Sequence, residues 1–126
     1  MNSQYHFKFE DLLVYQKAMS FGEEVDQLVI NFPQRELYAL SSQFRRAADS
    51  IALNIAEGYP GSDAQFVKHI NHALHSSNEC VSANEKALMR EYISYEQREE
   101  IRKQITTIQK MLTSLRSKIR QRLSES

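Results

Sequence analysis

The stretch from Gln43 to Gly58 constrains the fold of this chain more than any other part of the sequence. Apolar residues recur along it, and just before it, at steps of three and four, which is the spacing of one face of an α-helix. That face consists of Leu37, Leu40, Phe44, Ala48, Ile51 and Ile55. Small residues flank it, so a second helix can approach closely. The segment therefore predicts a helix inside a bundle, with Gln43 and Asn54 half buried at its edge.

Breaks in the periodicity divide the chain into four helical segments. Pro33 ends the first segment, because proline restricts the preceding residue and cannot continue the hydrogen-bond ladder. Gly58 is expected to close the second helix in a left-handed conformation, with Pro60 just beyond it. The predicted helices span about residues 10–30, 35–57, 63–92 and 95–122.

Two serine–glutamine pairs mark the starts of the last two helices. Ser62 with Gln65, and Ser94 with Gln97, have the spacing of a capping box. The chain holds only three glycines and two prolines, which favours a few long helices over many strands. Because the connections are short, neighbouring helices must run antiparallel. The sequence predicts an all-α protein, an antiparallel up-down-up-down four-helix bundle in a single domain over residues 1–126, with residues 1–8 as a loose arm.

The same periodicity identifies the residues that should fill the core. The first helix should bury a face formed by Leu12, Tyr15, Met19, Val25, Leu28 and Val29. Across the other three helices, the expected core residues are Phe44, Ile51, Ile55, Leu74, Val81, Ile105, Leu112 and Leu115. The single cysteine, Cys80, occupies an apolar position and is expected to be a small core residue and not a nucleophile.

Motifs that would indicate catalysis or a cofactor are absent from the sequence. There is no glycine-rich phosphate loop, no CxxC pair and no HExxH. His69, His72 and His75 lie three apart, but that spacing turns the outer two away from a common helix face, so no metal site is predicted. No catalytic residue and no cofactor is predicted. With no apolar run of membrane-spanning length and no signal-peptide core, a cytoplasmic location is expected.

Charge is unevenly distributed in a chain whose formal net charge is zero. Residues 101–126 contain seven basic residues and one acidic residue. Such a run is often only a solvated helix face, but five or so copies in an assembly would concentrate the positive potential. The candidate nucleic-acid-binding residues are Arg102, Lys103, Lys110, Arg116, Lys118, Arg120 and Arg122.

A second candidate surface lies on the polar side of the helix that contains Gln43 to Gly58. Leu53 is an apolar residue on this charged face, together with Arg46 and Glu57. Glu57 lies near the helix C-terminus, where the macrodipole disfavours an anion, so it should have a partner on another helix or another chain. An exposed leucine is common, but this pattern is also typical of a subunit contact. Arg46, Leu53 and Glu57 are therefore candidate oligomer-interface residues.

With these residues laid out, the chain resembles the four-helix bundle proteins encoded within intervening sequences of bacterial 23S ribosomal RNA genes, once labelled ribosomal protein S23. It is also similar to the accessory variability determinant of diversity-generating retroelements. The resemblance covers about residues 9–123 and rests on the segments 9–18, 31–33 and 43–58. Tyr15 stands where the family usually has tryptophan, and the turn after Gly58 lacks the family's basic residue.

The resemblance implies a homopentameric ring without enzymatic activity. For the retroelement relatives it implies binding to nucleic acid and to a reverse transcriptase. The expected function is a non-enzymatic, oligomeric helical scaffold that binds nucleic acid, in the form of structured RNA or a ribonucleoprotein. The first alternative is a protein–protein interaction adaptor whose basic helix meets an acidic partner. The second is a small-molecule or metal site inside the bundle.

Overall fold

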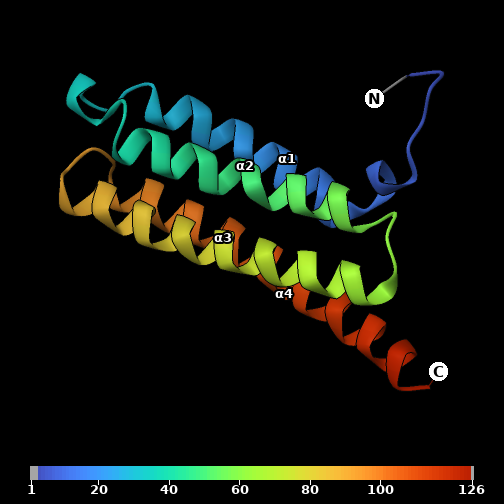
Figure 1. The fold of residues 1–126 in the computed structure, drawn as a ribbon. Coiled ribbons are helices and arrows are strands. Elements are labelled where there is room, and N and C mark those ends of the chain that lie inside the picture. The colour runs from blue at the N-terminus through green and yellow to red at the C-terminus, as the bar shows by residue number, and fades with distance from the viewer. Residues whose placement is uncertain (1–2, 126) are drawn as a thin grey trace.

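The computed structural model describes residues 3–125, and over that range the chain is entirely helical apart from its connections. The long helices run up and down beside one another (Figure 1). The all-α, antiparallel up-down-up-down bundle predicted from the sequence is confirmed. Its helices are α1 (Leu13–Val29), α2 (Leu40–Gly58), α3 (Asp63–Met89) and α4 (Tyr95–Glu125), and short 3-10 turns precede two of them at η1 (Lys8–Asp11) and η2 (Gln34–Glu36).

The two predicted capping boxes set the starts of α3 and α4. The Ser62 hydroxyl accepts a hydrogen bond from the Gln65 amide at 3.2 Å, and the Gln65 side chain accepts one from the Ser62 amide at 3.1 Å. Ser94 and Gln97 repeat this arrangement at 3.1 and 2.8 Å. Each box satisfies amide groups that a helix start leaves without partners.

The start of α2 differs from the prediction. The helix begins at Leu40, because the chain first makes the 3-10 turn η2 and then bends at Ala39. Leu37, predicted on the buried face, lies in this connection and is 42% exposed. Gln43 is also exposed and not half buried. The prediction for Leu37 failed because the apolar spacing continues through a segment that is not α-helical. Gln43 lies within α2, on a side of the helix that faces solvent.

Gly58 does not adopt the predicted left-handed conformation. It is the last residue of α2, and none of the described glycines has a positive φ. The reason for glycine is the close approach of α3. A Cβ atom built on Gly58 would lie 2.6 Å from the Cβ of His69 and 3.0 Å from the Phe66 ring. The absence of a side chain therefore lets the ends of α2 and α3 pack together.

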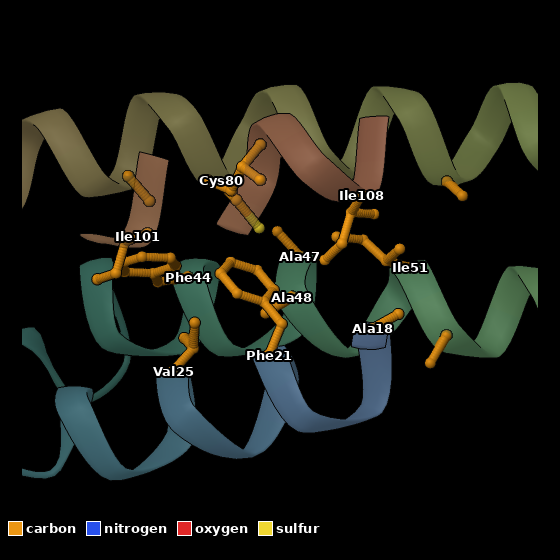
Figure 2. Packing of buried hydrophobic residues seen from close by; sticks show 14 of the residues in the cluster. Ala18, Phe21, Val25, Phe44, Ala47, Ala48, Ile51, Cys80, Ile101 and Ile108 are labelled. Carbon is orange, nitrogen blue, oxygen red and sulfur yellow. The ribbon is translucent and has the colours of Figure 1, made fainter. Parts of the chain in front are cut away.

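The core fills the space between the four helices, and Figure 2 shows side chains from all of them in contact. Of the predicted core residues, five are fully buried: Phe44, Ile51, Ile55, Ile105 and Leu112. Leu74, Val81 and Leu115 are half buried against this cluster. On α1 the predicted face was partly wrong. Met19 is 40% exposed, whereas Ala18 and Phe21 are buried, because they lie on the side of α1 that packs on the rest of the bundle, chiefly on α2.

The helices do not enclose the core equally. α2 packs on both α1 and α3, and α3 packs on α4, but α1 and α4 touch only sparingly. Toward the C-terminus of the chain, α4 diverges from α1 and α2 (Figure 1). The bundle is therefore open along the α1–α4 side. None of the helices in the described range is both long and apolar enough to cross a membrane.

Candidate nucleic-acid interface

The seven predicted cations of α4 fall into two groups according to their contacts. Arg122 binds the carboxylate of Asp63 on α3 through two hydrogen bonds of 3.0 and 3.2 Å, which lowers the pKa of that carboxyl. Arg116 donates a 2.7 Å hydrogen bond to the side-chain oxygen of Asn71, also on α3. These two guanidinium groups thus hold the C-terminal half of α4 against the start of α3.

A third cation of α4 is engaged nearer to the start of the helix. Arg102 lies 3.2 Å from the carboxylate of Glu85 on α3. The same carboxylate accepts a hydrogen bond from Arg98, whose guanidinium also stands over the ring of Tyr95 at 4.9 Å. Arg98 is outside the predicted set, and its role is to join α3 to α4. Sequence spacing could not identify these contacts, because they depend on how the two helices rotate against each other.

The remaining four cations stay on the surface. Lys110, Lys118 and Arg120 are exposed, and none of them has an ion pair or side-chain hydrogen bond within residues 3–125. Lys103 lines a hollow between α1 and α4. Between Glu100 and Glu125, α4 contains no acidic residue. The exposed face of this segment therefore carries positive charge that nothing on its own helix neutralises.

Free ammonium and guanidinium groups on a helix are suited to bind phosphate. Their contacts with a nucleic-acid backbone release counterions and depend little on the base sequence. Lys118 and Arg120 lie on the last turns of α4, which extend away from α1 and α2 (Figure 1). A partner can reach this part of the helix without disturbing the core.

The candidate oligomer-interface residues lie on the outer face of α2. Leu53 is 60% exposed, and Arg46 is exposed without an ion pair or side-chain hydrogen bond in the described part of the chain. Glu57 lies 3.7 Å from the Nδ1 atom of His69 on α3. This is the kind of partner on another helix that the position of Glu57 near a helix C-terminus requires.

The three histidines of α3 line a polar groove beside α2. His69 Nδ1 is 3.1 Å from the Asn54 side-chain oxygen, and the predicted half-burial of Asn54 is confirmed. The rings of His69, His72 and His75 follow one another at centroid distances of 6.1 and 6.4 Å. Within residues 3–125, no group of three or more histidine, cysteine or acidic residues has an arrangement that could hold a metal ion.

Comparison with known proteins identifies a family and solved structures that resemble this chain. The family model described as "23S rRNA-intervening sequence protein" matches residues 10–114 of this chain. A crystal structure of a protein of unknown function from the S23 ribosomal protein family of Bacteroides thetaiotaomicron superposes with a TM-score of 0.78 at 30% sequence identity. That match covers 88% of this chain and 99% of the other. A search of curated protein sequences finds no match.

Proposed function

Because this chain belongs to the 23S rRNA-intervening sequence protein family, we propose that it is a non-enzymatic, oligomeric helical scaffold that binds nucleic acid in the cytoplasm. The target is structured RNA or a ribonucleoprotein. The observation that carries this proposal is a set of cations, chiefly Lys118 and Arg120, that have no ion pair within residues 3–125 and lie on a segment of α4 without acidic residues. These groups supply contacts to phosphate and leave the bundle core intact.

Assembly strengthens this argument. One copy offers only a few free cations, which is too little for tight binding at physiological salt. In a ring, such as the homopentamer that the family resemblance implies, the same cations recur around one rim and their potentials add. Acidic residues elsewhere keep the formal net charge at zero, which opposes indiscriminate binding. The scaffold should therefore favour a ligand long enough to touch several subunits.

The experiment is fluorescence anisotropy with labelled structured RNA, single-stranded RNA and duplex DNA at low and high salt. The proposal predicts binding at low salt that weakens steeply as salt rises. Before nuclease treatment, the absorbance maximum of the purified protein should also be shifted toward 260 nm, because nucleic acid copurifies with it. A protein that binds none of the three ligands at low salt contradicts the proposal.

A second candidate function is an adaptor for an acidic protein partner. Two arginines of α4, Arg102 and Arg122, already bind carboxylates of α3, so this surface recognises carboxylates as well. Affinity purification followed by mass spectrometry, with and without nuclease, separates the two functions. A partner polypeptide that survives nuclease treatment, from a protein that does not bind RNA, would favour the adaptor.

A further inference from the structure

The segment before α1 alternates aromatic and basic residues. In chain order they are Tyr5, His6, Phe7, Lys8 and Phe9. Tyr5 is 74% exposed and Phe7 is 61% exposed, so two large rings of this segment face solvent. Aromatic rings interleaved with cations are the residue types that contact the bases and the phosphates of a single-stranded nucleic acid.

Three aromatic rings form a continuous stack that begins on the bundle. The Tyr15 ring packs against the core and meets the Phe9 ring edge to face, with 5.0 Å between the ring centroids. Phe9 in turn stacks on Phe7, with the centroids 6.0 Å apart and an angle of 28° between the ring planes. The stack ends at Phe7. Because most of this residue is exposed, its ring can accept one more flat ring.

Hydrogen bonds hold Phe7 in its place on the stack. Its backbone amide donates to the Glu10 carboxylate at 2.9 Å, and its carbonyl accepts from the Glu10 amide at 3.0 Å. The side chain of Gln16 on α1 donates a 2.7 Å hydrogen bond to the Glu10 carbonyl, which ties η1 to α1. The Phe7 ring is therefore positioned before a ligand arrives, so that binding there requires little further ordering of the protein.

The ionic groups beside Phe7 leave Lys8 available for a ligand. The Asp11 carboxylate lies 2.9 Å from the Nε2 atom of His6, and the Glu10 carboxylate lies 3.8 Å from the Nδ1 atom of the same ring. Lys8 is exposed and has no ion pair or side-chain hydrogen bond within residues 3–125. Its ammonium group can therefore contact the phosphate of a nucleotide whose base lies on Phe7.

This aromatic stack and the exposed cations of α4 lie at the same end of the bundle. The N-terminus of α1 and the C-terminus of α4 are both at this end, because successive helices alternate in direction, and η1 lies there as well (Figure 1). Lys118 and Arg120 belong to the last turns of α4. One RNA molecule can therefore contact α4 through its phosphates and Phe7 through a base.

We propose that Phe7 is a stacking site for an unpaired nucleobase of the bound RNA, with Lys8 on the adjoining phosphate. This inference rests on the proposed nucleic-acid binding and deepens it, because it names the part of the ligand that is recognised. Bases inside a duplex are covered by neighbouring pairs, whereas bases in loops, bulges and ends are open to aromatic side chains. The preferred ligand is therefore an RNA that contains single-stranded nucleotides, and not a continuous duplex.

The first test compares a labelled single-stranded RNA with a blunt RNA duplex that has the same number of phosphates, by fluorescence anisotropy at low salt. Phe7→Ala should weaken binding of the single strand about fivefold or more and change binding of the duplex by less than about twofold. The salt slope for the single strand should stay as in the wild type, because stacking releases no counterions.

Tyr38→Ala is the matched control for this comparison. Tyr38 is 93% exposed and lies in the connection between α1 and α2, at the opposite end of the bundle from η1. This variant should bind both RNAs as the wild type does. Phe7 and Tyr38 are both exposed, and circular dichroism verifies that each variant is folded.

The second test uses the absence of tryptophan from the chain. Phe7→Trp places a single fluorescent indole at the end of the stack and keeps an aromatic ring there. This variant should bind the single strand at least as tightly as the wild type, and its emission should fall on binding because a stacked base quenches the indole. The emission of Tyr38→Trp should stay unchanged.

The outcomes distinguish this stacking site from the proposed function as a whole. A wild type that binds neither RNA at low salt contradicts both. If the wild type binds, the stacking site is overturned when Phe7→Ala keeps full affinity for the single strand, when it weakens both RNAs equally, or when Phe7→Trp is not quenched. Loss of assembly by Phe7→Ala with unchanged affinity for RNA also overturns it, because the ring would then contact protein. In each of these cases phosphate binding by α4 still stands.

Discussion

The hydroxyl of Tyr92 donates a 2.6 Å hydrogen bond to the carboxylate of Glu36, which lies 56 positions earlier in the chain. Arg90 donates a second one to the same oxygen at 2.8 Å. Glu36 is only 4% exposed, although it lies in the connection between α1 and α2. Glu91 adopts a positive φ of 64° in the α3–α4 connection, beside these two donors. One buried carboxylate thus fastens the two connections at this end of the bundle.

Because of this contact, the free energy of unfolding should depend on pH in the acidic range. Hydrogen bonding from Tyr92, followed by that from Leu40 and Arg90, lowers the pKa of Glu36 below its ordinary value of 4.5 despite the opposing effect of burial. A lowered folded-state pKa gives stability that is present above pH 4.5 and is lost as the pH falls through the folded-state value. Urea denaturation of Glu36→Gln should show a lower midpoint at pH 7 than the wild type, and a smaller loss between pH 5 and 3.

Glu79→Gln is the control for this measurement, because Glu79 is exposed on α3. It should follow the wild type at every pH. If Glu36→Gln had the same midpoint as the wild type at pH 7, the buried carboxylate would not hold the two connections together.

Gly58→Ala should destabilise the protein, although alanine is the better helix former. The new Cβ would lie 2.6 Å from the His69 Cβ, which is fixed on α3, so the two helices must separate. We expect a loss of about 1–3 kcal/mol in the free energy of unfolding, as for other overpacked sites. Gly22→Ala is the matched control, since the atom that its Cβ would crowd is the side-chain carboxylate oxygen of Asp49 at 2.8 Å, whereas the nearest backbone atoms lie at 3.9 Å. It should be neutral, or more stable by up to about 1 kcal/mol.

Cys80 should be unreactive in the folded protein. Its side chain is completely buried, and burial raises the pKa of the thiol to about 12. The reactive thiolate is therefore almost absent at pH 8. Ellman's reagent should react with the native protein only as fast as the bundle opens. In a Cys80→Ala background, Ser82→Cys supplies an exposed thiol on the same helix. This thiol should react with the reagent about as fast as a free thiol in solution does. Equal rates for the two would show that Cys80 is accessible.

The sequence was sufficient for the helices that begin with local signals. The starts of α3 and α4 are fixed by side chains three residues apart, so Ser62 and Ser94 could be identified without knowledge of the fold. The start of α2 could not be identified in this way. It depends on Glu36, whose partner Tyr92 is distant in the sequence, and this contact favours a 3-10 turn where the apolar spacing continues. Gly58 was misread for the same reason, because its constraint comes from α3.

The sequence predicted which segment of the chain carries the basic residues of the candidate site, but not which of these residues are engaged in contacts within the bundle. The sequence identified the basic segment of α4, but it could not separate Arg122, which binds Asp63, from Lys118, which has no ion pair in the part of the chain that the structure describes. That distinction depends on the rotation of α4 against α3. The open side between α1 and α4 was not predicted. Periodicity identifies the buried face of each helix, but it does not reveal which pair of neighbouring helices makes few contacts.

The central claim, that free cations on the last turns of α4 bind nucleic acid, is tested with Lys118→Ala/Arg120→Ala. Lys110 is left in place so that only cations of the last turns are removed. The control is Lys68→Ala/Lys86→Ala, which removes two exposed lysines from α3. Both double variants should be folded and assemble as the wild type does, since none of the four side chains belongs to the core.

The decisive measurement is the slope of log affinity against log salt concentration, from fluorescence anisotropy with one labelled structured RNA. The account predicts that the α4 variant binds more weakly at low salt and that its slope is shallower by about one for each lost phosphate contact. The α3 control should retain both the affinity and the slope of the wild type. An α4 variant that binds as tightly as the wild type with an unchanged slope would contradict the account.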